Sequence, residues 1–260
     1  MPTAPNPRPS SRAALVTGAG QRIGCAIALA LARAGYAVAI HAHRSRPEAD
    51  RLCADIAAAG GRAAVVFCNL ADHDEVVGLV GMARAAVGPL TLLVNNAAEF
   101  EPDEIGHLDR TRFDRHFAVN LRTPLFLAEA FAGQSDEGAD ASIVNLLDQR
   151  VYRPTPRFLT YGLTKSALHA ATTTLAQALA PRVRVNAVAP GPTLPSRRQD
   201  AEIFARQSQS VPLGRGPSPA DVAAAVLYLA GARSVTGVTI AVDGGQHLAW
   251  RTADLTDIAE

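Results

Sequence analysis

The sequence predicts an α/β fold in which a single domain forms a doubly wound, parallel, seven-stranded sheet with helices on both faces. Three observations favour this fold. Short apolar runs rich in Val, Ile and Ala alternate with longer, alanine-rich amphipathic segments. The runs are apolar at almost every position, which is typical of parallel strands covered by helices on both faces. The chain has 260 residues and no shift in composition along its length, so one domain is expected.

The strands are predicted from the apolar runs in chain order. Most runs are rich in β-branched residues, and segments long enough for a crossover helix separate consecutive runs. The first run ends in a glycine-rich turn, and the fourth ends in the letters NNAA. The seven predicted strands are residues 13–17, 36–40, 63–67, 91–95, 142–146, 183–189 and 238–242.

The first residues, MPTAPNPRPSSR, are rich in proline and polar side chains and have no apolar core of a secretory signal. We therefore expect a disordered tail at residues 1–12 and the domain at residues 13–260. Three cysteines without disulfide or metal spacing favour reduced thiols and a cytoplasmic location. No apolar run approaches the roughly 20 residues of a membrane span.

The overall charge argues against polyanionic partners. The 25 Lys and Arg residues balance 24 Asp and Glu residues, which leaves a net charge of +1. No global field would therefore attract nucleic acid or an anionic membrane. The histidines and cysteines lack the spacing of a metal site, so no metal is expected. We expect a small-molecule substrate instead.

Two proline-containing loops interrupt the alternation of strands and helices, at residues 148–158 and from residue 190 onward. Long loops in compact domains are usually lids or binding loops. In an open α/β sheet, ligands bind beyond the carboxyl ends of the strands, where such loops emerge. We therefore assign residues 190–217 as the substrate-binding loop.

The turn TGAGQRIG after the first strand has the glycines of a phosphate-binding turn. Glycines let the backbone approach a pyrophosphate, and the N-terminus of the next helix favours an anion. The spacing of Gly18, Gly20 and Gly24 is one residue longer than the usual dinucleotide fingerprint, so this signal is weak alone.

The residues after the second strand indicate which dinucleotide is bound. Folds that bind NAD place an acidic residue there, against the ribose hydroxyls. This chain has His43, Arg44 and Ser45 instead, with Arg22 in the glycine turn. The two arginines suit a 2′-phosphate, so NADP is favoured over NAD. Alternatively, Arg44 and Arg46 are only solvated residues at the start of a helix.

Tyr161 and Lys165 are four residues apart, on one face of a predicted helix. A nearby cation lowers the pKa of a tyrosine and lets its phenol act as a proton donor. The pair is common by itself, but it gains weight from Asn120 in FAVN and from PGP after the sixth strand.

The motifs TGAGQRIG, NNAA, YGLTK, RVNAVAPG and VDGG, in this order, resemble the short-chain dehydrogenase/reductase family from Ala13 to Gly245. The resemblance implies a Rossmann-type fold, a nicotinamide cofactor and commonly a homotetramer. It implies that Tyr161 is the general acid, that Lys165 holds the nicotinamide ribose and lowers the tyrosine pKa, and that Asn120 anchors a proton-relay water. The residues expected to bind NADP(H) are Gly18, Gly20, Arg22, Ile23, Gly24, His43, Arg44, Ser45, Asn69, Leu70, Asn95, Ala97, Tyr161, Lys165, Pro190 and Gly191.

Two positions depart from the usual pattern of this family. Arg22 replaces a glycine of the turn, and Asp148 replaces the catalytic serine thirteen residues before the tyrosine. One subgroup, the pteridine reductases and dihydromonapterin reductases, is more similar to this chain. Its members can carry this arginine, a His-Arg-Ser run after the second strand and an aspartate in the serine position. An aromatic residue at the position of Phe100 stacks on the pterin ring in pteridine reductases.

Asp148 has two alternative roles. Reduction of a pterin C=N bond requires a proton on a ring nitrogen, and an aspartate hydrogen-bonded to Tyr161 can relay that proton from solvent. Alternatively, Asp148 only caps the following helix or pairs with Arg150 or Arg153. The expected substrate-binding residues are Phe100, Asp148 and Tyr161.

The expected function is NADPH-dependent hydride transfer to a pterin-type C=N bond, with Tyr161 as proton donor. One alternative is a ketone, sugar or acyl-thioester carbonyl reductase, and another is a noncatalytic nucleotide-sensing protein with the same fold. The family resemblance places the main tetramer interface on helices at residues 108–131 and 159–179. The C-terminal segment, residues 244–260, is expected to cover a neighbouring subunit's cleft.

Overall fold

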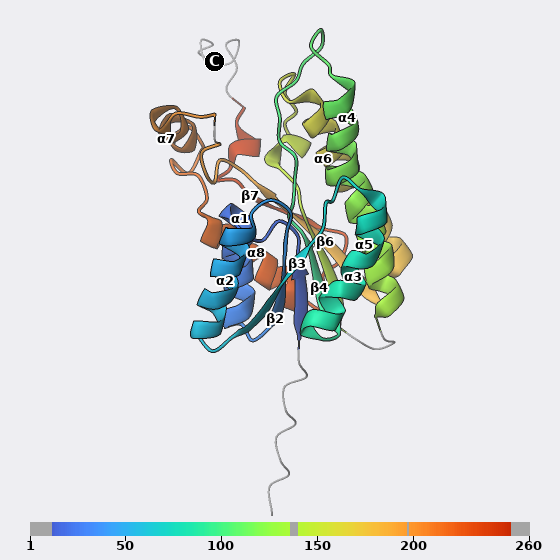
Figure 1. Cartoon of the computed structure of the whole chain (residues 1–260). Coiled ribbons are helices and arrows are strands. Elements are labelled where there is room, and N and C mark those ends of the chain that lie inside the picture. The colour runs from blue at the N-terminus through green and yellow to red at the C-terminus, as the bar shows by residue number, and fades with distance from the viewer. Residues whose placement is uncertain (1–11, 136–139, 197, 251–260) are drawn as a thin grey trace, which may run out of the picture.

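Seven parallel strands form one sheet at the centre of the structure, between two layers of helices (Figure 1). This computed structural model describes residues 12–135, 140–196 and 198–250. The strand order is β3-β2-β1-β4-β5-β6-β7, and every neighbouring pair is parallel, which confirms the predicted fold class. The strands are β1 (Ala13–Val16), β2 (Ala37–Ala42), β3 (Arg62–Phe67), β4 (Leu90–Asn95), β5 (Ala141–Leu146), β6 (Val183–Pro190) and β7 (Thr239–Val242).

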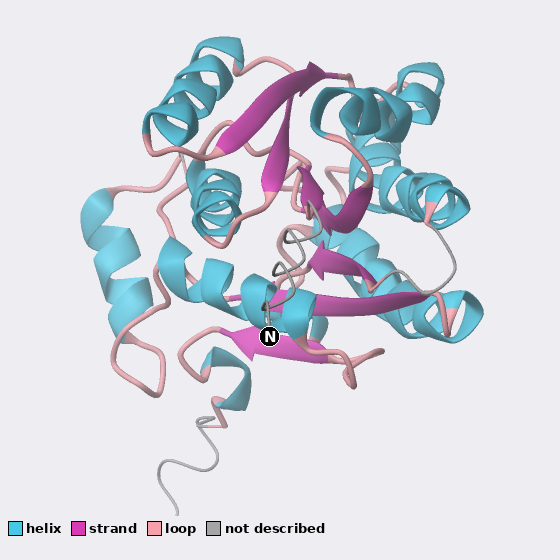
Figure 2. Cartoon of the chain, turned by 90° about the horizontal axis from the view of Figure 1, so that it is seen from below, coloured by secondary structure: helices cyan, strands magenta, loops and turns pink. Residues whose placement is uncertain are grey.

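Helices cover both faces of the sheet, as the view from below shows (Figure 2). Helices α1, α2 and α8 pack on one face, and α3, α5 and α6 pack on the other. A π-helical turn, Ala118–Arg122, joins α4 to α5. The helices are α1 (Arg22–Arg33), α2 (Arg46–Ala58), α3 (His73–Val87), α4 (Arg110–Phe117), α5 (Thr123–Gln134), α6 (Leu159–Leu179), α7 (Ala201–Gln209) and α8 (Pro219–Gly231).

Successive side chains along each strand point alternately into two apolar cores. Leu15, Leu93 and Ile143 are adjacent in the sheet and fully buried on the α3 side. The next residue along β1, Val16, is buried in the core on the α1 side, together with Val94 and Val144. Successive side chains of a strand point to opposite faces, so two covered faces require apolar residues at every position. This explains why the strands read as continuous apolar runs.

The strand order places the candidate site. β2 and β3 lie on one side of β1, whereas β4 and the strands after it lie on the other side. The direction in which strands are added to the sheet therefore reverses after β3. At such a switch point the loops beyond the carboxyl ends of adjacent strands separate and leave a crevice. The loops after β1, β4, β5 and β6 all emerge at this edge, which lies at the top of Figure 1.

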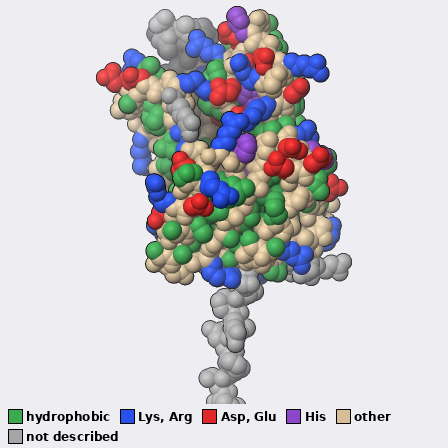
Figure 3. Space-filling view, viewed as in Figure 1, with side chains coloured by type: hydrophobic (Ala, Val, Ile, Leu, Met, Phe, Trp, Pro, Cys, Tyr) green, Lys and Arg blue, Asp and Glu red, His purple; other side chains and the backbone are tan. Residues whose placement is uncertain are grey.

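Each strand begins and ends within two residues of its predicted position. The interface helix predicted at residues 108–131 is instead α4, the π-helical turn and α5, and the loop at residues 190–217 contains α7. The predicted tail and residues 251–260 of the C-terminal segment lie outside the described residues, apart from Arg12. No described helix is long and apolar enough to cross a membrane. Basic and acidic side chains are both spread over the face in Figure 3.

Candidate active site

The turn after β1 brings its backbone close to the loop after β4. Gly18 has a φ of +62°, which favours glycine. A Cβ atom on Gly24 would lie 2.3 Å from the carbonyl oxygen of Gly18, so only glycine fits there. The Asn96 side-chain amide donates to the carbonyl oxygens of Thr17 (2.8 Å) and Gly18 (3.2 Å). These contacts fix the shape of the turn at the N-terminus of α1.

Arg22 occupies a strained position in this turn. Its φ of +57° lies in the left-handed region, where the usual glycine of the family would be unstrained. Its guanidinium donates to the carbonyl oxygens of Leu194 (3.3 Å) and Pro195 (2.9 Å) in the substrate-binding loop. Arg22 therefore connects the glycine turn to that loop, whereas Arg44 lies at the end of β2. Arg22 and Arg44 nevertheless line one and the same cavity.

His41 supports the glycine turn from within the sheet. It is 2% exposed, its Nδ1 accepts the N–H of Gly18 (3.0 Å), and its Nε2 lies 2.9 Å from the carbonyl oxygen of Cys68. Burial lowers the pKa of His41 to about 4. The imidazole is therefore neutral at physiological pH, with its proton on Nε2, and acts as a buried structural residue.

A cavity of about 770 Å³ extends from the glycine turn past the end of β2. The Arg44 side chain makes no hydrogen bond or ion pair with the described residues. Eight of the residues predicted to bind NADP(H) line this cavity: Gly18, Arg22, His43, Arg44, Ser45, Asn69, Leu70 and Ala97.

Five other predicted cofactor residues line neither this cavity nor the second one described below, namely Gly20, Gly24, Asn95, Lys165 and Pro190. The role of Asn95 in the cofactor cleft stays a prediction. Asn95 is 3% exposed, and its Nδ2 donates to Asn145 Oδ1 on the neighbouring strand at 2.9 Å. The next residue, Asn96, points towards the glycine turn instead, because successive side chains alternate in direction at a strand end.

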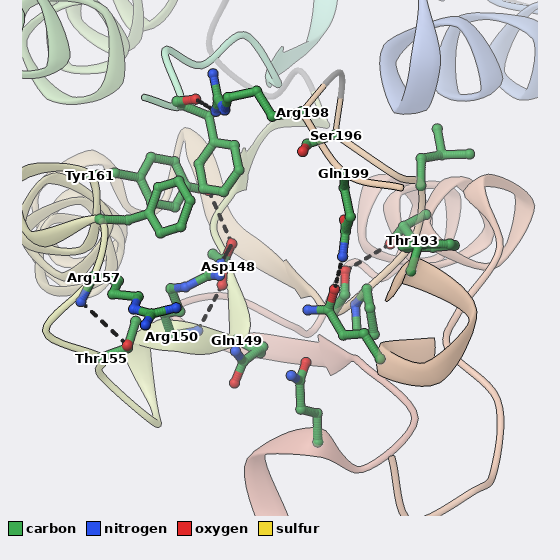
Figure 4. Close-up of a pocket in the computed structure, with 18 of the residues that line it drawn as sticks. Asp148, Gln149, Arg150, Thr155, Arg157, Tyr161, Thr193, Ser196, Arg198 and Gln199 are labelled. Carbon is green, nitrogen blue, oxygen red and sulfur yellow. Dashed lines mark hydrogen bonds and ion pairs between the residues drawn. The ribbon is translucent and has the colours of Figure 1, made fainter. Parts of the chain in front are cut away.

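A second cavity, of about 580 Å³, lies beyond the ends of β5 and β6 (Figure 4). Arg22, Phe100, Ser196 and Arg198 line both cavities, so the two spaces adjoin. The predicted substrate-binding residues all line the second cavity, together with Ile23, Gly191 and several residues of the 190–217 loop. Gln246, from the C-terminal segment, also lines the cavity of its own chain.

Tyr161 and Asp148 point towards one another in this cavity (Figure 4). The Tyr161 hydroxyl donates to Asp148 Oδ2 at 3.1 Å. Burial, and then the charge of Asp148, raise the pKa of Tyr161 well above its ordinary value, against a smaller lowering effect of Arg150. The phenol is therefore protonated at neutral pH, which is the form that can donate a proton.

Lys165 lies one helical turn after Tyr161 and is 2% exposed. Its Nζ donates to the carbonyl oxygen of Leu146 at 2.6 Å and lies 5.8 Å from the centroid of the tyrosine ring. Burial lowers the pKa of Lys165 to about 8, although the charge of Asp148 opposes this. Burial dominates the pKa of Tyr161, and the expectation that Lys165 lowers that pKa stays a prediction.

Asp148 makes the contacts of both alternatives at once. Its Oδ1 accepts the backbone N–H of Arg150 (2.9 Å), which caps the short 3-10 helix Gln149–Val151. Its Oδ2 accepts Nη1 of Arg150 (2.9 Å) in addition to the Tyr161 hydroxyl. The structural contacts therefore coexist with the contact to Tyr161, and Arg150 joins the site.

Phe100 belongs to an aromatic cluster. Its ring stacks on Phe158 with centroids 4.5 Å apart and planes 2° apart, and it meets Tyr161 edge to face at 4.7 Å. Phe158 precedes α6 and has a φ of +60°, a left-handed conformation that is rare for a phenylalanine. Sequence reasoning named Arg150 only as an alternative partner of Asp148, and it missed Phe158, whose only signal was its place in the proline-containing loop before the Tyr-Lys helix.

Asn120 connects the loop that carries Phe100 to the helix that carries Tyr161. It is fully buried in the π-helical turn, its Oδ1 accepts the N–H of Glu99 (2.8 Å), and its Nδ2 donates to Glu99 O (3.0 Å). The same Nδ2 donates to Thr164 Oγ1 on α6 at 3.2 Å. These contacts position both elements, and the expected role of Asn120 in anchoring a water stays a prediction.

Two arginines hold the loop at residues 190–217 against the rest of the site. Arg198 donates to the carbonyl oxygen of Phe100 and to Glu101 Oε2, both at 2.6 Å. With the contacts of Arg22 to Leu194 and Pro195, the loop is held at two points near the junction of the cavities.

Comparisons with known proteins agree with this geometry. A family model described as enoyl-(acyl carrier protein) reductase matches residues 18–247. An uncharacterized oxidoreductase of Mycobacterium tuberculosis is 36% identical, over 92% of this chain and 93% of that protein. The 3-oxoacyl-(acyl-carrier-protein) reductase FabG of Staphylococcus aureus is 32% identical, over 92% of this chain and 99% of that protein.

Solved structures are similar over most of their length. The FolM alternative dihydrofolate reductase 1 from Brucella canis, complexed with NADP, is 50% identical with a TM-score of 0.91, and the match covers 94% of this chain and 97% of that one. The resemblance drawn from the sequence motifs is confirmed by these matches together with the family model. The chain belongs to the short-chain dehydrogenase/reductase family of oxidoreductases.

Proposed function

We propose that this protein is an NADPH-dependent reductase that transfers a hydride to the C=N bond of a dihydropteridine- or dihydromonapterin-like substrate. The observation that carries the proposal is the hydrogen bond from Tyr161 to Asp148, in a cavity that Phe100 also lines. A hydroxyl donor such as serine would suit a carbonyl oxygen, whereas this carboxylate suits relay of a proton to a ring nitrogen. The similarity to FolM alternative dihydrofolate reductase 1 supports the same substrate class.

The first cavity fits a dinucleotide 2′-phosphate. The glycine turn has no room for a Cβ at Gly24 and opens at the N-terminus of α1, where backbone N–H groups favour a pyrophosphate. The uncommitted guanidinium of Arg44 is available for the 2′-phosphate. NADPH, when bound, supplies the hydride. The similar FolM structure is a complex with NADP, which supports this choice.

The proton steps follow from the contacts of Tyr161. Its hydroxyl gives a proton to the substrate nitrogen, and Asp148 then passes a proton taken from solvent to the phenolate across the same 3.1 Å hydrogen bond. The ammonium group of Lys165 stabilises the phenolate while it exists, because opposite charges attract strongly in a buried site. Phe100 offers an aromatic face to a planar substrate.

The second candidate is a carbonyl reductase, for which Asp148 is incidental. The 32% identity to FabG favours it, because FabG is named as a 3-oxoacyl reductase. The Asp148–Tyr161 contact argues for the pterin reductase, since the phenol is then directed to a carboxylate rather than to a hydroxyl donor.

A substrate screen distinguishes the two functions. Purified protein is tested for NADPH oxidation with dihydrobiopterin, dihydromonapterin, dihydrofolate, quinones, simple ketones and a 3-oxoacyl thioester. We expect turnover with at least one pterin, and a raised KM for it after Phe100→Ala, since a lost stacking face weakens uniform binding. Turnover of only ketones or thioesters would establish the carbonyl reductase instead.

We also propose a cytoplasmic homotetramer in which α4, α5 and α6 form the main interface. Apolar side chains are exposed on each of these helices, namely Phe113, Phe126 and Leu163. The free thiols of Cys25, Cys53 and Cys68 suit a reducing compartment.

A further inference from the structure

A third cavity, of about 370 Å³, adjoins the second one, because four residues, including Arg150, line both. Arg153, Pro154 and Pro156 complete the lining of the third cavity, and all three are exposed, so this space opens to solvent. The guanidinium carbon of Arg150 lies 5.6 Å from the ring centroid of Phe100. The third cavity therefore begins next to the aromatic face that we assign to the substrate, where a substituent of the substrate ring can enter it.

Arginines dominate the charge of these two cavities. Among the described residues that line them, the one acidic residue is Asp148, against five arginines: Arg22, Arg150, Arg153, Arg157 and Arg198. The whole chain has a net charge of only +1, so positive charge is concentrated at this place. A cavity lined by one sign of charge attracts ligands of the opposite sign. The lining therefore favours a substrate that carries negative charge.

Two of the five arginines are available to such a ligand. Arg22, Arg150 and Arg198 already bind loop carbonyls or a carboxylate of the protein. The guanidinium groups of Arg153 and Arg157 make no hydrogen bond or ion pair with the described residues. Their donors are therefore free to bind the oxygens of a ligand.

The backbone that carries these two side chains is held in place. The N–H of Arg153 donates to the carbonyl oxygen of Gln149 at 3.2 Å, and the N–H of Arg157 donates to Thr155 Oγ1 at 3.4 Å. Two prolines between the arginines each fix their own φ angle. Figure 4 shows Arg150, Thr155 and Arg157 on the side of the second cavity across from the substrate-binding loop. Binding of a ligand therefore requires ordering of side chains rather than of the loop, which lowers its entropic cost.

We propose that the guanidinium groups of Arg153 and Arg157 form a subsite for an anionic group, a carboxylate or a phosphate, on the side chain of the substrate ring. This inference rests on the proposed function and narrows its substrate class to dihydropterins with an acidic side chain. The planar guanidinium presents paired N–H donors that match the oxygens of either group.

The test compares KM and kcat for NADPH-dependent reduction in the parent, Arg153→Gln, Arg157→Gln and the double variant. Dihydrofolate carries carboxylates, dihydroneopterin monophosphate carries a phosphate, and dihydrobiopterin has an uncharged side chain. Exposed ion pairs are weak, so each single variant should raise KM for an anionic substrate about threefold relative to KM for dihydrobiopterin, and the double variant about tenfold. The loss should appear in KM rather than in kcat, because the subsite binds the ground state and the transition state alike. It should shrink in about 1 M NaCl, where charges are screened within about 3 Å.

Arg62→Gln is the matched control. Arg62 is also exposed, its side chain makes no hydrogen bond or ion pair with the described residues, and it begins β3 at the opposite end of the sheet. A larger effect on dihydrofolate identifies a carboxylate as the ligand of the subsite, and a larger effect on the phosphate ester identifies a phosphate. Equal changes in KM for dihydrobiopterin and both anionic substrates, or changes no larger than those of the control, would overturn the proposal.

Failure of the proposed function is distinguishable from failure of the subsite. If the parent reduces only carbonyl substrates, the proposed function fails, and a keto acid and its uncharged methyl ester replace the pterins. The double variant should then raise KM for the acid about tenfold relative to KM for the ester. Equal changes for the acid and the ester would exclude the anion subsite as well.

Discussion

The buried Lys165 predicts a pH-dependent stability that can be measured without any substrate. Its ordinary pKa is 10.5 and its pKa in the folded protein is about 8. Below pH 8 the lysine is charged in both the folded and the unfolded state, and the cost of burying that charge is fully present. Between pH 8 and 10.5 the folded protein releases the proton first, so this cost disappears as pH rises.

The size of the effect follows from the separation of the two values. At 1.36 kcal/mol for each pKa unit, burial of the charge lowers the free energy of unfolding by about 3 kcal/mol at neutral pH. Lys165→Met removes the charge but keeps most of the volume. It also leaves the carbonyl oxygen of Leu146 without its 2.6 Å donor, a loss that is independent of pH.

Urea denaturation of the parent and of Lys165→Met at pH 7.5 and at pH 10 isolates this effect, because other titrations largely cancel in the difference. The stability of the parent relative to the variant should rise by about 2 to 3 kcal/mol between the two pH values. A difference that does not change with pH would refute the reasoning that the lysine charge is buried at a cost. A residue that lowers stability can be retained for its function. For Lys165, the function that we propose is to stabilise the Tyr161 phenolate.

Three further predictions concern the cofactor, the acid and the assembly. The parent should prefer NADPH over NADH at least about tenfold in kcat/KM, a preference that needs only about 1.4 kcal/mol. Arg44→Gln should remove most of this preference, whereas the control variant Arg46→Gln should keep it. Equal efficiency of the parent with both cofactors would contradict the assignment. Tyr161→Phe should abolish turnover while the fold and NADPH binding are retained, since it removes one hydroxyl; activity above about a tenth of the parent would exclude Tyr161 as the acid. Light scattering at micromolar concentration should give a particle mass of about four times the 27.2 kDa chain mass. Phe126→Lys should lower this particle mass. A stable monomer of the parent would argue against the tetramer.

The fold was predictable because buried parallel strands leave a strong pattern in the sequence. Residues such as Leu15 and Val16 must both be apolar when both faces of the sheet are covered, and the pattern of runs follows. The sequence alone does not show which strands are neighbours, and that order came from the structure.

The site was predictable only where motifs fix positions along one element. Tyr161 and Asp148 were found from spacing, but Arg150 and Phe158 lie in an irregular loop, where no periodicity indicates the direction of a side chain. Spacing suggested that Lys165 would lower the pKa of the tyrosine. Spacing carries no information on burial, which raises that pKa in the structure.

The central claim is that Asp148 serves reduction of a C=N bond through Tyr161. It is tested most directly by kcat/KM with NADPH for a dihydropterin and for a simple ketone, in the parent and in Asp148→Ser. Serine restores the residue that the family usually has, and NADPH binding verifies that the variant is folded. We predict a loss on the order of a hundredfold for the pterin, the usual contribution of one acid-base partner, with the ketone little affected. Equal pterin reduction by both proteins, or no pterin reduction by the parent, would contradict the account.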